Sequence, residues 1–159
     1  MRQPLRFGVV GGYGSTGRVV VAELLKSRDG EILVGGRDLD KGKALAAKFD
    51  GRITATQLDV CDEGSLDRFC EQCSIIVNCA GPVMELQDRL AQAAWRARCH
   101  YLDLAGLSYV KDRMLSHQHA IADEGLSFVI SAGWLPGLSE ILPAYAHSRA
   151  QSEMDTSNR

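Results

Sequence analysis

The sequence predicts a doubly wound α/β fold, in which helices cover both faces of a parallel sheet. Apolar, strand-like runs alternate with stretches of helical periodicity along the 159 residues. Two neighbouring parallel strands need a connection long enough to contain a helix, and such crossover connections are right-handed. The run SIIVNC at 74–79 is apolar almost throughout, which is typical of a strand buried on both faces.

We expect about six strands with helices between them, forming one domain over residues 1–150. A domain of this size buries roughly two thirds of the surface of its unfolded chain. The polar tail 151–159 is expected to be disordered. The strands are expected at 5–10, 31–34, 53–60, 74–79, 100–104 and 127–131, and the helices at 16–26, 38–49, 62–71 and 86–97, with a further helix through Met114 and Ile121 and a last apolar stretch at 138–145.

Composition and charge exclude several classes of partner. The net charge of -2 gives no reason to expect nucleic acid or an anionic membrane. No run approaches the ~18 apolar residues of a membrane span, and the first ten residues lack the apolar centre of a signal peptide.

The five cysteines lie within predicted elements. Their odd number and placement indicate reduced thiols in a cytoplasmic protein.

A glycine-rich loop, GGYGSTG at 11–17, lies between the first expected strand and the first helix. Glycines let a backbone turn tightly and approach a pyrophosphate, and the following helix directs free N–H groups at the phosphates. This strand–loop–helix context is the one that the motif requires, although a plain turn is the alternative. The loop therefore predicts a Rossmann-type domain, with strand order 3-2-1-4-5-6. Its expected cofactor-binding residues are Gly11, Gly12, Gly14, Ser15, Thr16 and Gly17.

The end of the second strand bears on the choice between NAD and NADP. NAD enzymes place a carboxylate there, about 20 residues beyond the glycines, for the ribose 2′-hydroxyl. This chain has Arg37, which suits a 2′-phosphate, and Lys41 adds a second positive charge one turn later. Asp38 could accept from a ribose hydroxyl, but a helix N-cap is the favoured interpretation. The sequence predicts NADP, with NAD as the alternative.

Two further strand ends belong to the expected cofactor site. Asp59 and Val60 close the third strand, where such folds pass the adenine ring. Asp59 either accepts from the adenine amino group or caps the next turn. The small residues Ala80, Gly81 and Pro82 follow the fourth strand, where backbone can pack against the nicotinamide ribose. A tight loop is the alternative there.

No catalytic residue is assigned from the sequence. Short-chain dehydrogenases use Tyr-x-x-x-Lys, but Tyr109 is followed at that spacing by Arg113, and Tyr145 by Arg149. Asp103 lies near the carboxyl end of the fifth strand, where ligands gather. It either orients a substrate or relays a proton, or it caps the following loop, which is the favoured interpretation.

Metal and redox chemistry are not predicted. Cys70 and Cys73 have the spacing of a redox pair, but without the thioredoxin context they are interpreted as two ordinary thiols. His117 and His119 are two residues apart and so face different sides of a helix, which argues against a metal site.

Several motifs occur together in one order. They are GGYGSTGR, GGRDLDK, LDV at 58–60, NCAGP at 78–82, YLDLAG at 101–106 and SAGWLPGLSE at 131–140, spread over most of 5–146. With them the chain resembles the NADP-binding domain of the saccharopine dehydrogenase-like family, which includes saccharopine reductases and trans-acting enoyl reductases. The resemblance implies an NAD(P)-dependent oxidoreductase that acts on a small-molecule substrate. Trp134-Leu135 departs from the segment of many relatives, so the substrate is not transferred.

Relatives in this family continue with a substrate and dimerisation domain that the present sequence does not show. A non-catalytic NADP-binding sensor or interaction protein therefore stays open as an alternative to the oxidoreductase. The chain by itself is expected to bind cofactor without turnover, because nothing opposes the nicotinamide to position an acceptor. The apolar segment from Trp134 to Tyr145 is expected to be partly exposed and to form a homodimer or larger oligomer.

Overall fold

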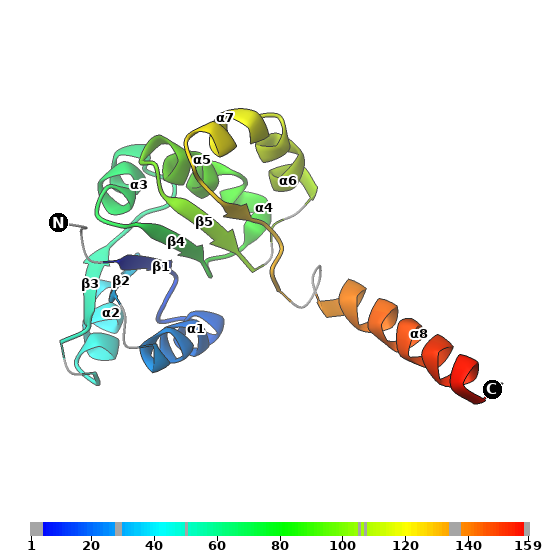
Figure 1. Cartoon of the computed structure of the whole chain (residues 1–159). Helices are drawn as coiled ribbons and strands as arrows, with labels where there is room; N and C mark the ends of the chain where they lie inside the picture. The colour runs from blue at the N-terminus through cyan, green and yellow to red at the C-terminus, as the bar shows by residue number, and fades with distance from the viewer. Residues whose placement is uncertain are drawn as a thin grey trace.

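A six-stranded parallel sheet forms the centre of the protein, in a computed structural model that describes residues 5–27, 30–49, 51–104, 106, 108–133 and 138–157 (Figure 1). The strand order is β3-β2-β1-β4-β5-β6, and every neighbouring pair is parallel. The doubly wound fold and its predicted order 3-2-1-4-5-6 are confirmed. The strands are β1 (Arg6–Val10), β2 (Glu31–Gly36), β3 (Ile53–Gln57), β4 (Ile75–Asn78), β5 (His100–Asp103) and β6 (Phe128–Val129).

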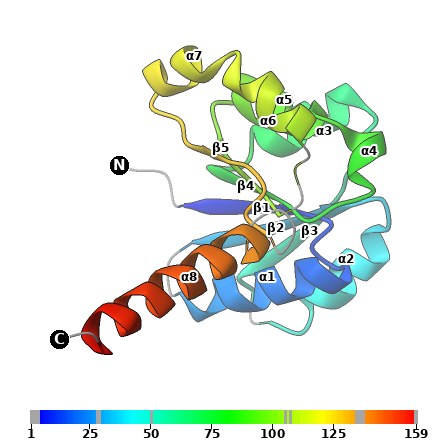
Figure 2. The same ribbon diagram turned by 90° about the vertical axis from the view of Figure 1, so that its right-hand side faces the viewer.

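Helices cover both faces of this sheet. Figures 1 and 2 show α1 and α2 on one face, and α3, α5, α6 and α7 on the other. The helices are α1 (Ser15–Lys26), α2 (Leu39–Ala46), α3 (Glu63–Cys70), α4 (Val83–Leu86), α5 (Arg89–Arg96), α6 (Ser108–Leu115), α7 (Gln118–Asp123) and α8 (Leu138–Ser157).

Neighbouring residues of the central strands enter two different cores. Val9 packs in the cluster under α1 and α2, whereas Val10 packs in the cluster under α3, α5 and α6. In β4, Ile76 and Val77 divide between the same two clusters. Side chains alternate across a strand, so a sheet covered on both faces needs apolar residues at consecutive positions. This explains the unbroken apolar runs of β1, β2 and β4.

Some predicted elements are longer than those observed. The third strand was expected to reach Val60, but β3 ends at Gln57. Beyond it, the Asp59 carboxylate accepts from the N–H of Cys61 at 2.9 Å, so the chain turns toward α3. A polar side chain that bonds to its own backbone competes with strand pairing. The expectation that Asp59 and Val60 lie within the strand is therefore wrong.

The helix expected through Met114 and Ile121 is in fact two helices, α6 and α7. The Ser116 hydroxyl donates to the carbonyl of Arg113 at 2.6 Å, and His117 is the N-cap of α7. The His117 ring also packs against Trp95, with ring centroids 4.7 Å apart. These local and tertiary contacts compensate for the helical hydrogen bonds that are lost at the break.

The chain ends in α8, which projects from the body of the domain in Figure 1. The helix contains the apolar stretch 138–145 and continues past residue 150 to Ser157. The expected domain boundary at residue 150 and the disorder of the tail stay predictions. Trp134 and Leu135 lie outside the described residues. Leu138, Ile141, Leu142 and Tyr145 are exposed. Self-association through these side chains also stays a prediction. No helix in the described ranges has both the length and the apolar character needed to span a membrane.

Three cysteines lie together at the carboxyl end of α3 and after α5. Cys70 and Cys99 are buried, and Cys73 is half-buried. The Cys99 Sγ donates to the carbonyls of Cys70 and Cys73 at 3.2 and 3.0 Å. Burial raises the pKa of Cys70 far above its ordinary value and raises the pKa of Cys73 to about 12. Because the thiolate is the reactive form, this geometry supports the interpretation of Cys70 and Cys73 as ordinary thiols.

We expect a maleimide near neutral pH to modify the exposed Cys61 and to leave Cys70 and Cys73 unmodified until the protein unfolds. Mass spectrometry of peptides after brief labelling measures this. The matched control is the same reaction in denaturant, where every cysteine should react. Loss of two hydrogen masses from the peptides with Cys70 and Cys73 after mild oxidation would revive the redox interpretation.

Candidate dinucleotide-binding site

A cavity of about 280 Å³ opens at the carboxyl ends of β1, β2 and β4. β1 lies between β2 and β4, so this is the point where the strand order reverses and where open α/β sheets bind ligands. Many of the predicted cofactor residues, although far apart in sequence, line this one space. They are Gly11, Gly14, Arg37, Asp59, Val60, Ala80, Gly81 and Pro82.

The remaining predicted residues lie elsewhere. Thr16 lines a neighbouring, smaller cavity. Gly12 and Gly17 are buried beneath the loop, and Ser15 is exposed in the first turn of α1. Asp38 and Lys41 lie at the start of α2, next to Arg37. The loop lies between β1 and α1 as expected, but the sequence did not separate the residues that line the cavity from those that do not.

Three glycines of the loop are needed for its shape. Gly11 has a φ of +73°, and its N–H donates to the carbonyl of Gly35 at 2.8 Å. A Cβ at Gly17 would lie 2.6 Å from the Cα of Gly12 and closer still to the Gly11 carbonyl. A Cβ at Gly12 would lie 3.0 Å from the Val34 side chain. These positions let α1 pack closely on the end of the sheet.

Gly14 has a different role, because it faces the cavity. It is the N-cap of α1, with extended backbone angles of -71° and 173° and without a side-chain cap. The first turn of α1 has no acidic residue. The N–H groups of this turn and the positive end of the helix dipole therefore favour an anion. Gly14 lines the cavity, and the binding of a pyrophosphate at this loop stays a prediction.

Arg37 follows β2 and is exposed at the cavity. Its carbonyl accepts from the Gln57 side chain at 3.4 Å, while its guanidinium forms no ion pair with any residue of the described ranges. A charged group in this situation can bind a ligand without first breaking a contact. The guanidinium presents a planar fork of donors that matches phosphate oxygens.

Asp38 caps α2, as the favoured interpretation predicted. Its carboxylate accepts from the N–H of Lys41 at 3.1 Å and forms an ion pair with the Lys41 ammonium at 3.0 Å. These two bonds to Lys41 hold the pKa of Asp38 below its ordinary value. The Asp38 carboxylate raises the pKa of Lys41 in turn. The ammonium of Lys41 is therefore shared with Asp38 and is not a second isolated charge.

Sequence reasoning missed Tyr13, which lies within the glycine loop and lines the cavity. Its hydroxyl accepts from the backbone N–H of Asp38 at 2.9 Å. Its ring lies so close to Gly36 that a Cβ there would be 2.6 Å from a ring carbon. Two features of the sequence could have indicated this contact. One is the aromatic residue between the loop glycines, and the other is the Gly-Gly pair at the end of the second strand.

Asp59 both caps a turn and borders the cavity. Its carboxylate accepts from the N–H of Cys61, which is the capping role that the sequence left open. The same residue also lines the cavity beside Val60. The alternative role toward an adenine amino group therefore stays a prediction.

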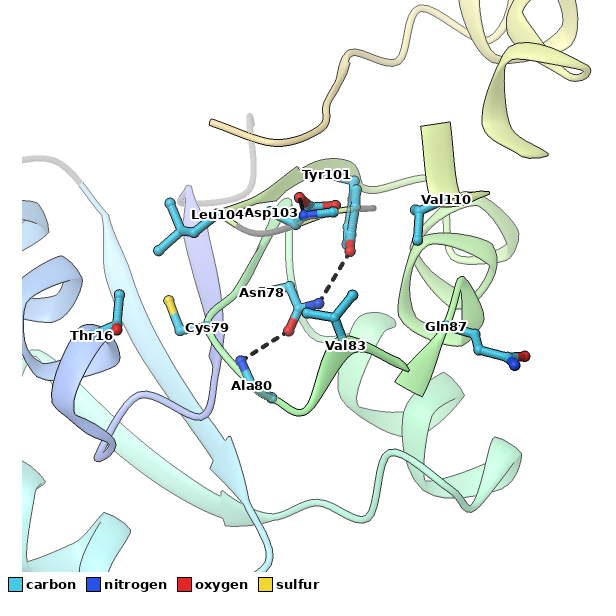
Figure 3. Close-up of a pocket in the computed structure, with 11 residues that line it drawn as sticks. Thr16, Asn78, Cys79, Ala80, Val83, Gln87, Tyr101, Asp103, Leu104 and Val110 are labelled. Atoms are coloured by element: carbon cyan, nitrogen blue, oxygen red, sulfur yellow. Dashed lines mark hydrogen bonds between the residues drawn. The ribbon is translucent and has the colours of Figure 1, made fainter. Parts of the chain in front are cut away.

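A smaller cavity of about 90 Å³ lies beyond β4 and shares Cys79 and Ala80 with the first (Figure 3). Asn78 links its walls: the amide nitrogen donates to the Tyr101 hydroxyl at 3.3 Å, and the amide oxygen accepts from the N–H of Ala80 at 3.0 Å. Burial raises the pKa of Tyr101 far above its ordinary value, so this phenol stays protonated.

Asp103 borders the smaller cavity and is buried, with 2% of its surface exposed. Its carboxylate accepts from the N–H of Gly106 at 2.6 Å and from the N–H of Ser131 at 2.8 Å. It thereby joins the loop after β5 to the segment after β6. The structure supports the favoured interpretation, in which Asp103 caps the loop.

Together, fold and site define a Rossmann-type dinucleotide-binding domain. Residues 7–129 match the family described as saccharopine dehydrogenase NADP binding domain, and the chain belongs to this family. NADP is the cofactor for which this family is named. The resemblance inferred from the sequence motifs is confirmed.

A longer homologue is similar to this chain in sequence, and a longer solved structure is similar to it in fold. The chain is 31% identical to the "Probable mitochondrial saccharopine dehydrogenase-like oxidoreductase" of Arabidopsis thaliana, over 78% of this chain and 30% of that protein. The saccharopine dehydrogenase (L-Glu forming) of Saccharomyces cerevisiae aligns with a TM-score of 0.75 and 18% identity, over 93% of this chain and 32% of that one. The chain spans about a third of the length of either protein.

The fold recurs in more distant structures. A short-chain dehydrogenase/reductase of the wide type from Veillonella parvula, in complex with NADP, aligns with a TM-score of 0.57 and 14% identity, over 80% of this chain and 68% of that one. At this identity the likeness shows the fold alone.

Proposed function

We propose that this chain holds NADP, in preference to NAD, for an oxidoreductase that acts on a small molecule. One observation carries the proposal: a single cavity joins the glycine loop, which fits a pyrophosphate, to Arg37, which fits a 2′-phosphate. The family name and the oxidoreductase name of the Arabidopsis relative support the reaction class.

Different residues bind different parts of the extended dinucleotide. The loop from Gly11 to Gly17 and the first turn of α1 bind the pyrophosphate. Arg37 binds the 2′-phosphate, and Asp59 and Val60 border the adenine. The small residues from Ala80 to Pro82 leave room for the nicotinamide ribose. The bound cofactor supplies hydride at nicotinamide C4, and this chain orients it.

The Asp38–Lys41 pair favours NADP over NAD. In an NAD site the acid after the second strand accepts from the ribose 2′-hydroxyl. Here the carboxylate is already bonded to the N–H and to the ammonium of Lys41. Lys41 also offsets the repulsion between Asp38 and a phosphate dianion. Arg37 lines the cavity and forms no ion pair with any described residue.

We expect the protein to bind NADPH at least tenfold more tightly than NADH, measured by titration of nicotinamide fluorescence. As a matched pair of competitors, 2′,5′-ADP should displace NADPH and 5′-AMP should not, because they differ only in the 2′-phosphate. Equal binding of the two cofactors, or tighter NADH, would contradict the NADP assignment and make Asp38 the ribose ligand. Cofactor binding without NADPH consumption in the full-length protein would favour the non-catalytic sensor.

A further inference from the structure

Tyr13 connects two parts of the site that are separate in sequence. It belongs to the glycine loop, yet its hydroxyl accepts from the N–H of Asp38, 25 residues further along the chain, at 2.9 Å. Asp38 directly follows Arg37 and begins α2. This hydrogen bond therefore ties the pyrophosphate loop to the turn that presents the guanidinium.

Both ends of Tyr13 are held in place. The guanidinium of Arg18 donates from its Nε to the Tyr13 carbonyl at 2.8 Å, which fixes the backbone within the loop. At the other end, the ring lies against Gly36, where a Cβ would be 2.6 Å from a ring carbon. The same ring approaches Gly42 in α2, at 3.9 Å from a Cβ position. Gly36 thus leaves the space that the ring occupies, whereas a Cβ at Gly42 would make only an ordinary contact with it.

The hydrogen bond between the Tyr13 hydroxyl and the Asp38 N–H helps to hold the turn after β2. Among the described residues, the Gly36 carbonyl at the end of β2 accepts from the N–H of Leu58 at 2.9 Å, and the Arg37 carbonyl accepts from Gln57 at 3.4 Å, which is long for a hydrogen bond. Within the described ranges, the Asp38 carboxylate bonds to Lys41 of α2. Two side chains from elsewhere in the described chain form hydrogen bonds with the backbone of residues 37 and 38, and the bond to the Tyr13 hydroxyl is the shorter of the two. A flexible arginine loses rotamer entropy on binding, and a turn held in position reduces that cost.

We propose that Tyr13 is a positioning residue that determines cofactor specificity: by holding the turn at Arg37 and Asp38, it sets the guanidinium at the 2′ end of the dinucleotide. The inference rests on the proposed function, because it assigns to Tyr13 the placement of the group that reads the 2′-phosphate. Tyr13 acts through Arg37 and does not itself supply the charge.

The substitution Tyr13→Phe tests this directly. It removes the hydroxyl and keeps the ring that packs on Gly36, so the glycine loop retains its shape. We expect NADPH binding to weaken about fivefold, in the range of one lost hydrogen bond, and NADH binding to change less than twofold. Nicotinamide fluorescence titration of both cofactors gives this ratio. Tyr109→Phe, on the exposed face of α6 outside both cavities, is the matched control and should change neither affinity.

A double-mutant cycle with Arg37→Ala shows whether Tyr13 acts through Arg37. Once the guanidinium is absent, adding Tyr13→Phe should change NADPH binding less than twofold. Gly36→Ala provides a second variant, because its methyl group displaces the Tyr13 ring. It should lower the preference for NADPH in the same direction as Tyr13→Phe.

The outcomes separate the inference from the function on which it rests. A wild-type protein without preference for NADPH would overturn both. A preference that Arg37→Ala abolishes but Tyr13→Phe leaves intact would overturn the role of Tyr13 alone. Equal weakening of NADPH and NADH in Tyr13→Phe, or full additivity with Arg37→Ala, would assign Tyr13 to loop structure and overturn the inference.

Discussion

Replacement of Arg37 with alanine should lower the affinity for NADPH by at least tenfold and leave the affinity for NADH nearly unchanged. A hydrogen bond to a charged group contributes roughly 1.5–3 kcal/mol, which corresponds to a factor of about 10 to 150. The guanidinium is exposed and forms no ion pair with the described residues, so its removal should not weaken the fold. Fluorescence titration with the two cofactors measures the effect.

Two controls sharpen this result. Arg68→Ala removes an equally exposed arginine from α3 and should not change cofactor preference. Arg37→Lys keeps the charge but loses the planar fork, so it should weaken NADPH binding less than alanine does. If alanine at position 37 weakens both cofactors equally, Arg37 has a structural role and the NADP assignment is wrong.

Gly14→Val should weaken NADPH and NADH alike, by at least tenfold or about 1.4 kcal/mol, while the melting temperature stays close to that of the wild type. The backbone of Gly14 is extended, which any residue can adopt, and a Cβ there would contact only the Gly11 carbonyl, at 3.1 Å. This contact is tight but is the only one within 4 Å, so we expect the fold to accommodate the branched side chain and the proposed pyrophosphate space to be blocked. Titration and thermal unfolding of the same preparation measure the two effects.

Gly17→Ala is the matched comparison, because it should act on the fold. Its Cβ would overlap the backbone of Gly11 and Gly12, which cannot move without displacing α1. Strain of this kind costs about 1–3 kcal/mol or more, so the free energy of unfolding should fall markedly. A folded Gly14→Val protein that binds NADPH like the wild type would falsify the placement of the pyrophosphate at this loop.

Much of the architecture was predictable because its signals are local. Consecutive apolar residues in β1 and β4 indicated a sheet buried on both faces, and each half of such a pair does enter a different core. Element boundaries were less predictable. β3 stops at Gln57 because the Asp59 carboxylate bonds to the chain ahead of it, and the break between α6 and α7 involves the distant Trp95.

Some features of the candidate site were likewise predictable from local sequence, and others only from the tertiary structure. The sequence by itself determined the glycine loop, the arginine after the second strand and the family, because spacing along the chain specifies which residues follow each parallel strand. Only the tertiary structure decided that Gly14 faces the cavity while Gly17 lies beneath it, and that Asp38 is engaged by Lys41. It also decided that Tyr13 reaches Asp38 and that Asp103 joins two loops. Most of these roles depend on contacts between segments that are distant in sequence, and no local pattern of residues encodes which distant groups meet.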